Sequence, residues 1–203
     1  MTFIKNFDQL AKTPEREAVL ELVEEGLRSI QPEEIFRTSV QRHRNILTIG
    51  DQEFDLADFE RVFILGLGKG SAGNSKLLEK LILDRLTEGY VIDTEGEKFD
   101  KIKFTKGTHP LPSETNFKFT QNALERLSNL TEKDLVLIVV CGGGSALFVY
   151  PHSISLEQKI AVGKALLASG ANITEMNIVR KHLSDVKGGG LAQILFPATV
   201  ATL

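Results

Sequence analysis

From residue 61 onward, short apolar runs alternate with stretches of helical periodicity, and this alternation constrains the fold more than any other feature. The apolar runs cover residues 62–65, 90–92 and 135–140, and residues 102–104 are a further expected strand. Apolar residues recur at helical spacing after the first run, and again after Ser113 and after Ser155, which forms a capping box with Gln158. Strands that are apolar throughout are typical of a parallel sheet with helices on both faces. We therefore expect an α/β domain of three layers with a mostly parallel sheet.

The first sixty residues predict a small helical and hairpin region in front of that domain. Thr13 and Pro14 form a helix start, because the hydroxyl can cap and proline suits the first helical position. The expected elements are helices over residues 14–30 and 32–43 and a hairpin whose strands, 46–49 and 53–56, flank Gly50-Asp51.

Composition excludes several functional classes. The chain has 203 residues, of which 42% are hydrophobic and 25% charged, so we expect one soluble domain. A net charge of −3 gives no basic excess for binding nucleic acid. No segment has the length and apolarity of a signal peptide or a membrane span, so the expected location is cytoplasmic. Cys141 is the only cysteine, which excludes an internal disulfide and a multi-cysteine zinc site.

The glycine loop after the run 135–140 is the best candidate for a ligand site. Three successive glycines, Gly142, Gly143 and Gly144, stand between Cys141 and Ser145. Without Cβ atoms, backbone N–H groups can converge on an anion, and a helix starting at Ala146 would point its positive end there. The loop predicts a phosphate or carboxylate cradle, although a glycine-rich turn without a ligand gives the same pattern.

A second glycine loop, residues 66–73, follows the run 62–65. It is not a P-loop, because Lys69 is followed by Gly70 and not by Ser or Thr. It fits the dinucleotide fingerprint poorly, because Ser71 stands at the third glycine position, although Asp93 lies where a ribose acceptor is expected. Lys69 could meet a phosphate at this strand end or simply face solvent.

Two further segments carry polar side chains suited to binding. His109 lies beside Pro110 and Pro112, in a stiff stretch that could orient it for proton transfer or leave it satisfied by the backbone. Arg180 and Lys187 are seven residues apart, so on an unbroken helix they project from one side toward an anionic ligand. A charged outer face would produce the same spacing.

In combination, these motifs resemble the glycerate 2-kinase family of the MOFRL-associated type. The residues that carry the resemblance are Gly66-Leu67-Gly68-Lys69-Gly70, His109-Pro110-Leu111-Pro112, Gly142 to Leu147, Ser169 to Ile173, and Asn177 to Ser184 with Lys187-Gly188-Gly189. The resemblance covers nearly the whole chain. It implies a Rossmann-like α/β/α domain and transfer of a phosphoryl group from ATP, assisted by Mg²⁺, to the 2-hydroxyl of D-glycerate.

The resemblance also implies roles for individual residues. Lys69 would be the catalytic cation. The residues implied to bind substrate or phosphate are Gly68, His109, Gly142, Gly143, Gly144, Ser145, Asn177, Arg180, Lys187, Gly188 and Gly189. No metal ligand can be assigned from this sequence.

The carboxyl end departs from the family pattern. Residues 198–203 form an apolar run with strand character, and the chain stops within it. Residues 1–203 would thus be the amino-terminal domain without the carboxy-terminal MOFRL domain, which a separate chain from a split gene could supply. We expect these residues alone to bind ligand weakly and to turn over little.

Two alternatives from other functional classes remain open. An NAD(P)-dependent reductase of the hydroxypyruvate type would use Gly66-Leu67-Gly68 for pyrophosphate and Asp93 for ribose. A truncated, non-catalytic domain would only bind a ligand or a partner chain.

Overall fold

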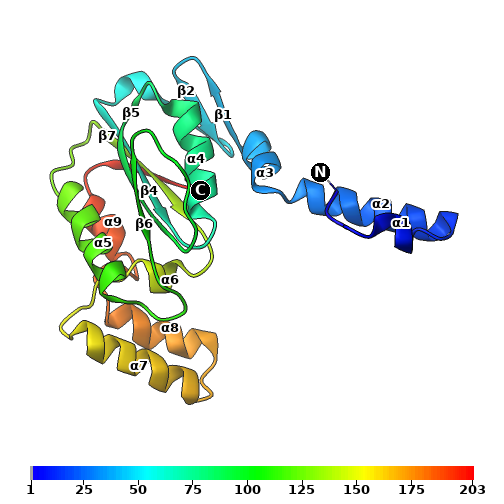
Figure 1. The fold of residues 1–203 in the computed structure, drawn as a ribbon. Coiled ribbons are helices and arrows are strands. Elements are labelled where there is room, and N and C mark those ends of the chain that lie inside the picture. The colour runs from blue at the N-terminus through cyan, green and yellow to red at the C-terminus, as the bar shows by residue number, and fades with distance from the viewer. Residues whose placement is uncertain (1) are drawn as a thin grey trace.

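The computed structural model describes residues 2–203 and contains a five-stranded parallel sheet between layers of helices (Figure 1). The strands lie in the order β6-β5-β4-β7-β8. Their bounds are β4 Arg61–Leu67, β5 Leu86–Asp93, β6 Ile102–Lys106, β7 Asp134–Val140 and β8 Thr199–Thr202. Every neighbouring pair is parallel, so the expected α/β fold with a parallel sheet is confirmed.

Alternate residues of the central strands feed two separate cores, one on each face of the sheet. Ile64 and Leu137 pack in a core with α4, Ser71–Ile82. Leu65 and Val136 face the other way and pack with α5, Glu114–Arg126, and α9, Gly190–Leu195. Because both faces of β4 and β7 are buried along nearly their whole length, these two strands are largely apolar, which is the pattern that predicted the three layers.

A helical hairpin lies beyond the carboxyl ends of the strands, below α6 in Figure 1. It consists of α7, Leu156–Ala168, and α8, Ile173–His182; α6 is a single turn, Gly144–Leu147. The capping box of Ser155 and Gln158 is present, as expected. Ser113 precedes α5 as predicted, but its hydroxyl donates to Asn116 Oδ1 instead of accepting a backbone N–H.

In the amino-terminal region, one helix agrees with its prediction and a second helix is shorter than predicted. Helix α2, Pro14–Ser29, agrees with the prediction, and α1 covers Phe7–Leu10. The predicted helix over residues 32–43 is wrong beyond residue 39: α3 is Pro32–Ser39, and β1, Val40–His43, pairs with β2, Ile46–Ile49. Strand β3 is Gln52–Asp55, followed by a short 3-10 helix, Leu56–Asp58. The expected hairpin is therefore part of a three-stranded antiparallel sheet, in which pairing with β2 overrides helix periodicity at Val40.

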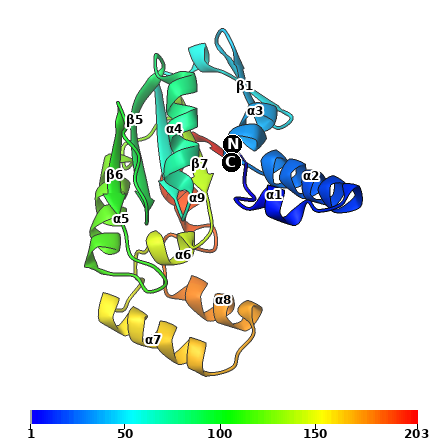
Figure 2. The same ribbon diagram turned by 45° about the vertical axis from the view of Figure 1, so that its right-hand side comes forward.

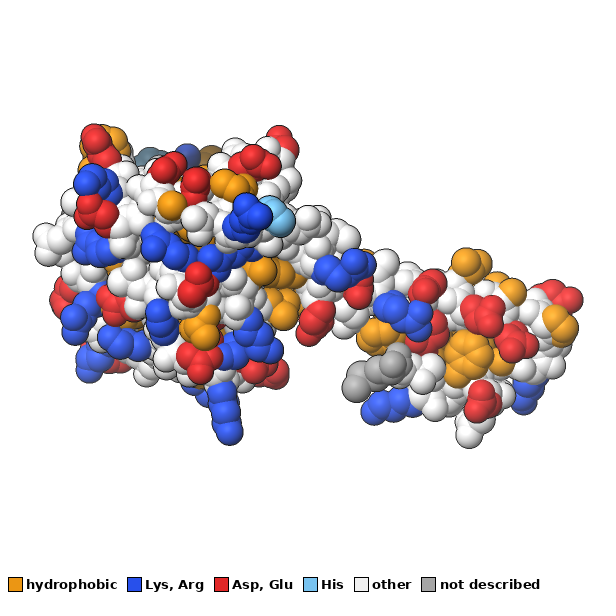
Figure 3. Space-filling view, turned by 90° about the horizontal axis from the view of Figure 1, so that it is seen from above, with side chains coloured by type: hydrophobic (Ala, Val, Ile, Leu, Met, Phe, Trp, Pro, Cys, Tyr) orange, Lys and Arg blue, Asp and Glu red, His pale blue; other side chains and the backbone are white. Residues whose placement is uncertain are grey.

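Helices α1 and α2 form an arm that projects from the body of the molecule (Figures 1 and 2). Val19, Leu22 and Val23 are more than 40% exposed, and hydrophobic side chains are visible along the arm in Figure 3. The apolar spacing thus predicted the helix correctly, but here it does not mark a buried face. None of the helices in residues 2–203 combines the length and apolarity needed to cross a bilayer.

Candidate functional site

The two glycine loops meet at the point where the strand order of the sheet reverses. The chain runs from β4 to β5 and β6 on one side of β4, and then returns to place β7 on the other side. Leu67 at the end of β4 lies opposite Val140 at the end of β7. Just beyond them, the N–H of Lys69 donates to the carbonyl of Gly142 at 2.7 Å. Ligands of open α/β sheets bind at such a reversal, outside the carboxyl ends of the strands.

The first glycine loop is closed by a carboxylate of the chain itself. Asp93 is 2% exposed, and its Oδ2 accepts the N–H groups of Gly70 at 2.8 Å and Ala72 at 3.0 Å. These are the amides at the start of α4 that a dinucleotide pyrophosphate would need. Asp93, which the reductase alternative needs as ribose acceptor, is therefore engaged in capping α4.

The second glycine loop is open. Gly143 has φ +77°, a conformation that favours glycine, and α6 begins at Gly144 instead of the expected Ala146. Because α6 has only four residues, its dipole contributes little. Within residues 2–203, the N–H groups of Gly143 and Ser145 donate to no protein acceptor. They are the backbone donors that this loop offers to a ligand.

His109 and Lys69 both lie against Gly143. A Cβ added at Gly143 would stand 2.6 Å from Cδ2 of His109, 2.7 Å from its Nε2 and 3.4 Å from Cε of Lys69. Only glycine therefore allows the imidazole to approach this loop. The structure brings together three of the predicted site residues here.

Asn116, which the sequence did not single out, fastens the His109 segment to the open loop. The side chain is fully buried, and its Oδ1 accepts the N–H of Thr108 at 2.9 Å. Its amide donates to the carbonyls of Thr108 and Ala146, each at 2.9 Å. A buried amide with all these partners fixes two loops relative to each other.

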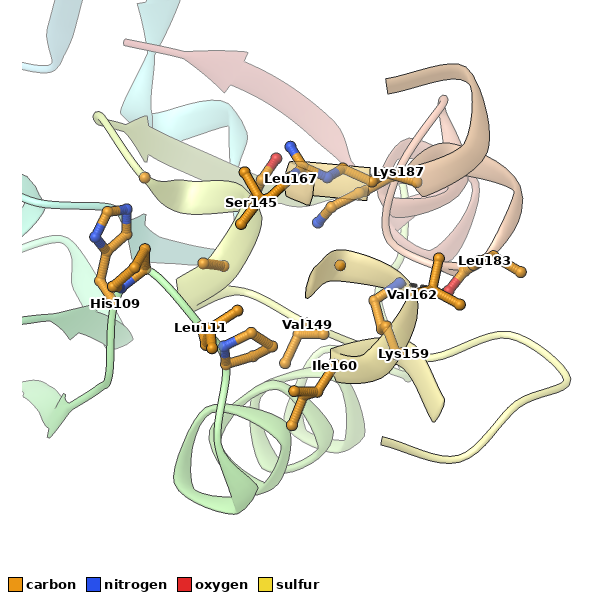
Figure 4. A pocket seen from close by; sticks show the side chains of 16 residues that line it. His109, Leu111, Ser145, Val149, Lys159, Ile160, Val162, Leu167, Leu183 and Lys187 are labelled. Carbon is orange, nitrogen blue, oxygen red and sulfur yellow. Dashed lines mark hydrogen bonds between the residues drawn. The ribbon is translucent and has the colours of Figure 1, made fainter. Parts of the chain in front are cut away.

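A cavity of about 280 Å³ lies between these loops and the α7–α8 hairpin (Figure 4). Predicted site residues among its lining are His109, Gly143, Ser145, Arg180 and Lys187. Lys159 adds a third basic side chain beside Arg180 and Lys187, and no Asp or Glu lines the cavity. Three basic side chains without a carboxylate would favour an anionic ligand over a cation.

Lys187 is more strongly perturbed than Lys159. Its Nζ donates to the carbonyl of Phe148 at 3.1 Å. Burial, with smaller contributions from the charges of Lys159 and Arg180, lowers the pKa of Lys187 to about 8. A bound anion would relieve both effects, because it neutralises the charges and supplies an acceptor.

Lys159 is a second residue that the sequence analysis did not single out. It lies on α7, and its Nζ donates to the carbonyl of Leu183 on the neighbouring segment. Burial lowers the pKa of Lys159, Asp185 opposes this, and Arg180 adds to it. Its sequence context is that of an ordinary helix lysine, so only the packing of α7 against α8 reveals its place.

The prediction that Arg180 and Lys187 share an unbroken helix is wrong. Helix α8 ends at His182, after which the N–H of Asp185 donates to the carbonyl of Tyr150 at 3.1 Å. This backbone pairing turns the segment after α8 back toward the glycine loop. Both side chains nevertheless reach the same cavity, by a turn and not by helical spacing.

The other predicted residues do not line this cavity. Lys69 is exposed beside Gly143, and Asn177 is exposed on α8. Gly68 and Gly144 are buried where a Cβ would clash, at Gly68 with the Cys141 carbonyl and at Gly144 with Leu67. Gly142 is exposed, and Gly188 and Gly189 form the turn that starts α9.

The residues at this site do not fit Mg²⁺. The described part of the chain holds no group of three or more His, Cys, Asp or Glu side chains suited to a metal. Magnesium is bound by carboxylates and phosphate oxygens, and the cavity presents cations instead. This wall of the site therefore suits the anion that a metal would accompany, and not the metal.

Comparison with known proteins agrees with this geometry. Residues 18–203 match the family described as "Domain of unknown function (DUF4147)". A glycerate 2-kinase from Picrophilus torridus is 31% identical over 97% of this chain and 46% of its own length. A putative hydroxypyruvate reductase from Agrobacterium vitis is 40% identical over 70% of this chain and 38% of its own length.

A solved structure has the same fold as this chain. The crystal structure of a protein from Pyrococcus horikoshii superimposes with a TM-score of 0.81 at 33% identity, over 94% of this chain and 43% of that one. The chain thus spans less than half the length of the relatives it matches. The resemblance to glycerate 2-kinases is confirmed, and the chain belongs to the DUF4147 family.

Proposed function

We propose that this chain forms one wall of the active site of a kinase that transfers a phosphoryl group from ATP to the 2-hydroxyl of D-glycerate. The observation that carries the proposal is the cavity lined by Lys159, Arg180 and Lys187 without a carboxylate. The name of the Picrophilus torridus relative supplies the reaction. Both substrates of that reaction are anions.

The arrangement suits phosphoryl transfer because that reaction depends mainly on positioning and on positive charge around the transferred group. Arg180 and Lys187 would hold anionic oxygens, with the free N–H groups of Gly143 and Ser145 beside them. Lys69, exposed beside Gly143, would neutralise charge that develops during transfer.

The remaining wall belongs, in this proposal, to a carboxy-terminal MOFRL domain on the same protein or on a separate chain. The relatives are more than twice as long as the part that they share with this chain. Metal ligands for Mg²⁺ would come from outside the cavity lining, which lacks carboxylates.

The structure favours the kinase over the reductase alternative. A reductase of the dinucleotide-binding type needs the α4 amides for pyrophosphate, and Asp93 occupies them. The Agrobacterium vitis name alone supports the reductase.

The test measures ADP formation from ATP and D-glycerate by the 203-residue chain, alone and joined to the remaining part of the Picrophilus torridus relative. We expect glycerate-dependent ADP formation from the joined protein and little from the chain alone. Lys69→Ala should lower kcat about 100-fold in the joined protein, as loss of a charge-stabilising donor does elsewhere. Lys118→Ala, an exposed lysine on α5, is the control and should change kcat less than about twofold.

Two results would contradict the proposal. The joined protein could form no ADP with glycerate although it is folded, or it could oxidise NADH with hydroxypyruvate, which would favour the reductase. Unchanged kcat in Lys69→Ala would remove Lys69 from the mechanism.

A further inference from the structure

The cavity offers apolar side chains as well as basic ones. Figure 4 shows Leu111, Val149 and Ile160 on one side, with Lys159 beside Ile160, and Ser145, Leu167 and Lys187 on the other side. The proline and leucine segment Pro110 to Pro112 continues the apolar side of Leu111. Among the described lining residues, the apolar side has no carboxylate or amide side chain.

D-Glycerate is too polar to pack favourably against the apolar side chains of this cavity. Each of its three carbons carries oxygen, so burying it against Leu111 and Ile160 would leave polar groups without hydrogen-bond partners. The cavity volume of about 280 Å³ is close to the lower end of the range of pockets that bind drug-sized ligands. Such ligands are much larger than a three-carbon acid. The occupant must carry negative charge at one end and a large apolar surface at the other.

We infer that this cavity binds the nucleotide of the reaction, with the base against Leu111 and Ile160 and the phosphates toward Lys187, Arg180 and Ser145. The choice of a nucleotide over other amphipathic anions rests on the proposed function. A flat heterocyclic base supplies the apolar surface, and its phosphates supply the charge that the basic side chains need. The glycerate then meets the phosphates from the side of Lys69, at the edge of the cavity that His109 lines.

The test compares ATP with inorganic triphosphate, which has the charge of the nucleotide tail but no base. Binding of each to the 203-residue chain is measured by calorimetry without added metal. We expect saturable binding of ATP in the millimolar range, with inorganic triphosphate binding more weakly. Ile160→Ser should weaken ATP about tenfold, because it removes most of one apolar contact, and should leave triphosphate within about twofold. Lys187→Gln should weaken both ligands about equally.

Ile173→Ser is the matched control, because Ile173 is 60% exposed on α8 and does not line the cavity. It should change neither affinity, and thermal melting of each variant checks folding. The inference is overturned if Ile160→Ser leaves ATP affinity unchanged, if it weakens triphosphate equally, or if ATP binds no more tightly than triphosphate.

The outcomes separate this inference from the proposed function. If ATP binds with the expected pattern but the joined protein transfers no phosphoryl group to glycerate, the proposed function is wrong and the nucleotide site is still supported. If the joined protein forms ADP with glycerate but Ile160→Ser leaves its KM for ATP unchanged, only the nucleotide site is wrong.

Discussion

The two glycine loops at the reversal of the sheet carry similar sequence signals but differ in what they can bind. Each follows a buried parallel strand, and each leads into a helix. In the first loop, Asp93 accepts the N–H groups of Gly70 and Ala72. In the second, the N–H groups of Gly143 and Ser145 donate to no acceptor within residues 2–203, and the loop borders a cavity lined by cations.

The difference shows that glycine content describes the shape of a loop and not its occupancy. Glycines let the backbone approach an anion, but the anion can be a carboxylate of the same chain. Here one loop is closed by an internal carboxylate, which stabilises the fold, and the other is left for a ligand. Four expectations follow, from the largest effect to the smallest.

Asp93→Asn should cause the largest loss of stability. It replaces a buried carboxylate that accepts three backbone N–H groups by an amide, whose own N–H atoms oppose them. We expect the free energy of unfolding to fall by about 2–3 kcal/mol, as measured by urea denaturation. Asp51→Asn, an exposed Asp in the β2–β3 turn, should change it by less than about 0.5 kcal/mol. Equal small effects would mean that Asp93 does not close the first loop.

Gly143→Ala should damage the open loop. The backbone there has φ +77°, and the added Cβ would meet His109 at 2.6 Å. We expect a loss of about 1–2 kcal/mol in stability and a clear loss of sulfate affinity, both measured on the purified chain. Gly142→Ala is a close control, since its Cβ would meet nothing within 4 Å. If both variants behave alike, the contact between His109 and Gly143 has no role in binding.

Sulfate binding should weaken as the pH rises through the pKa of Lys187. Sulfate stays doubly charged in this range, so only the protein titrates. With a pKa of about 8, Lys187 is mostly charged at about pH 7 and mostly neutral at about pH 9, so the affinity should fall up to about tenfold. Lys187→Gln should bind sulfate weakly at both pH values. A steep pH dependence that survives this substitution would assign the titration to another group, such as Lys159, whose pKa is also lowered.

The same depressed pKa has an opposite consequence for stability without ligand. Between the folded pKa of about 8 and the higher pKa of an unfolded lysine, the unfolded chain binds more protons. The contribution of Lys187 to the free energy of unfolding should therefore increase as the pH rises through that window. Urea denaturation of the wild-type chain and Lys187→Gln at about pH 7 and about pH 10 measures this difference.

Much of the fold could be predicted because apolar strands and caps are local signals. The run 135–140 indicated a buried strand, and Ser155 with Gln158 indicated the start of α7. The sequence pattern placed Val40 in a helix. In the structure it pairs instead with Ile49 of β2, a strand that comes later in the chain. Pairing between segments is not visible in the periodicity of either one.

The candidate site was predicted only in part. Sequence reasoning found His109, Gly143 and Ser145 because glycine and proline mark loops that position side chains. It paired Arg180 with Lys187 for the wrong reason, since the helix ends between them. It missed Lys159 and the capping by Asp93, because both depend on how distant segments pack.

The most direct test of the contrast between the loops follows the backbone amides while sulfate is added. Amide nitrogen–proton correlation spectra of the 203-residue chain report each N–H separately. We expect the signals of Gly143 and Ser145 to shift in a saturable way, and those of Gly70 and Ala72 to stay in place because Asp93 holds them. Shifts at Gly70 and Ala72 with none at Gly143 and Ser145 would contradict the assignment of the open loop as the anion site.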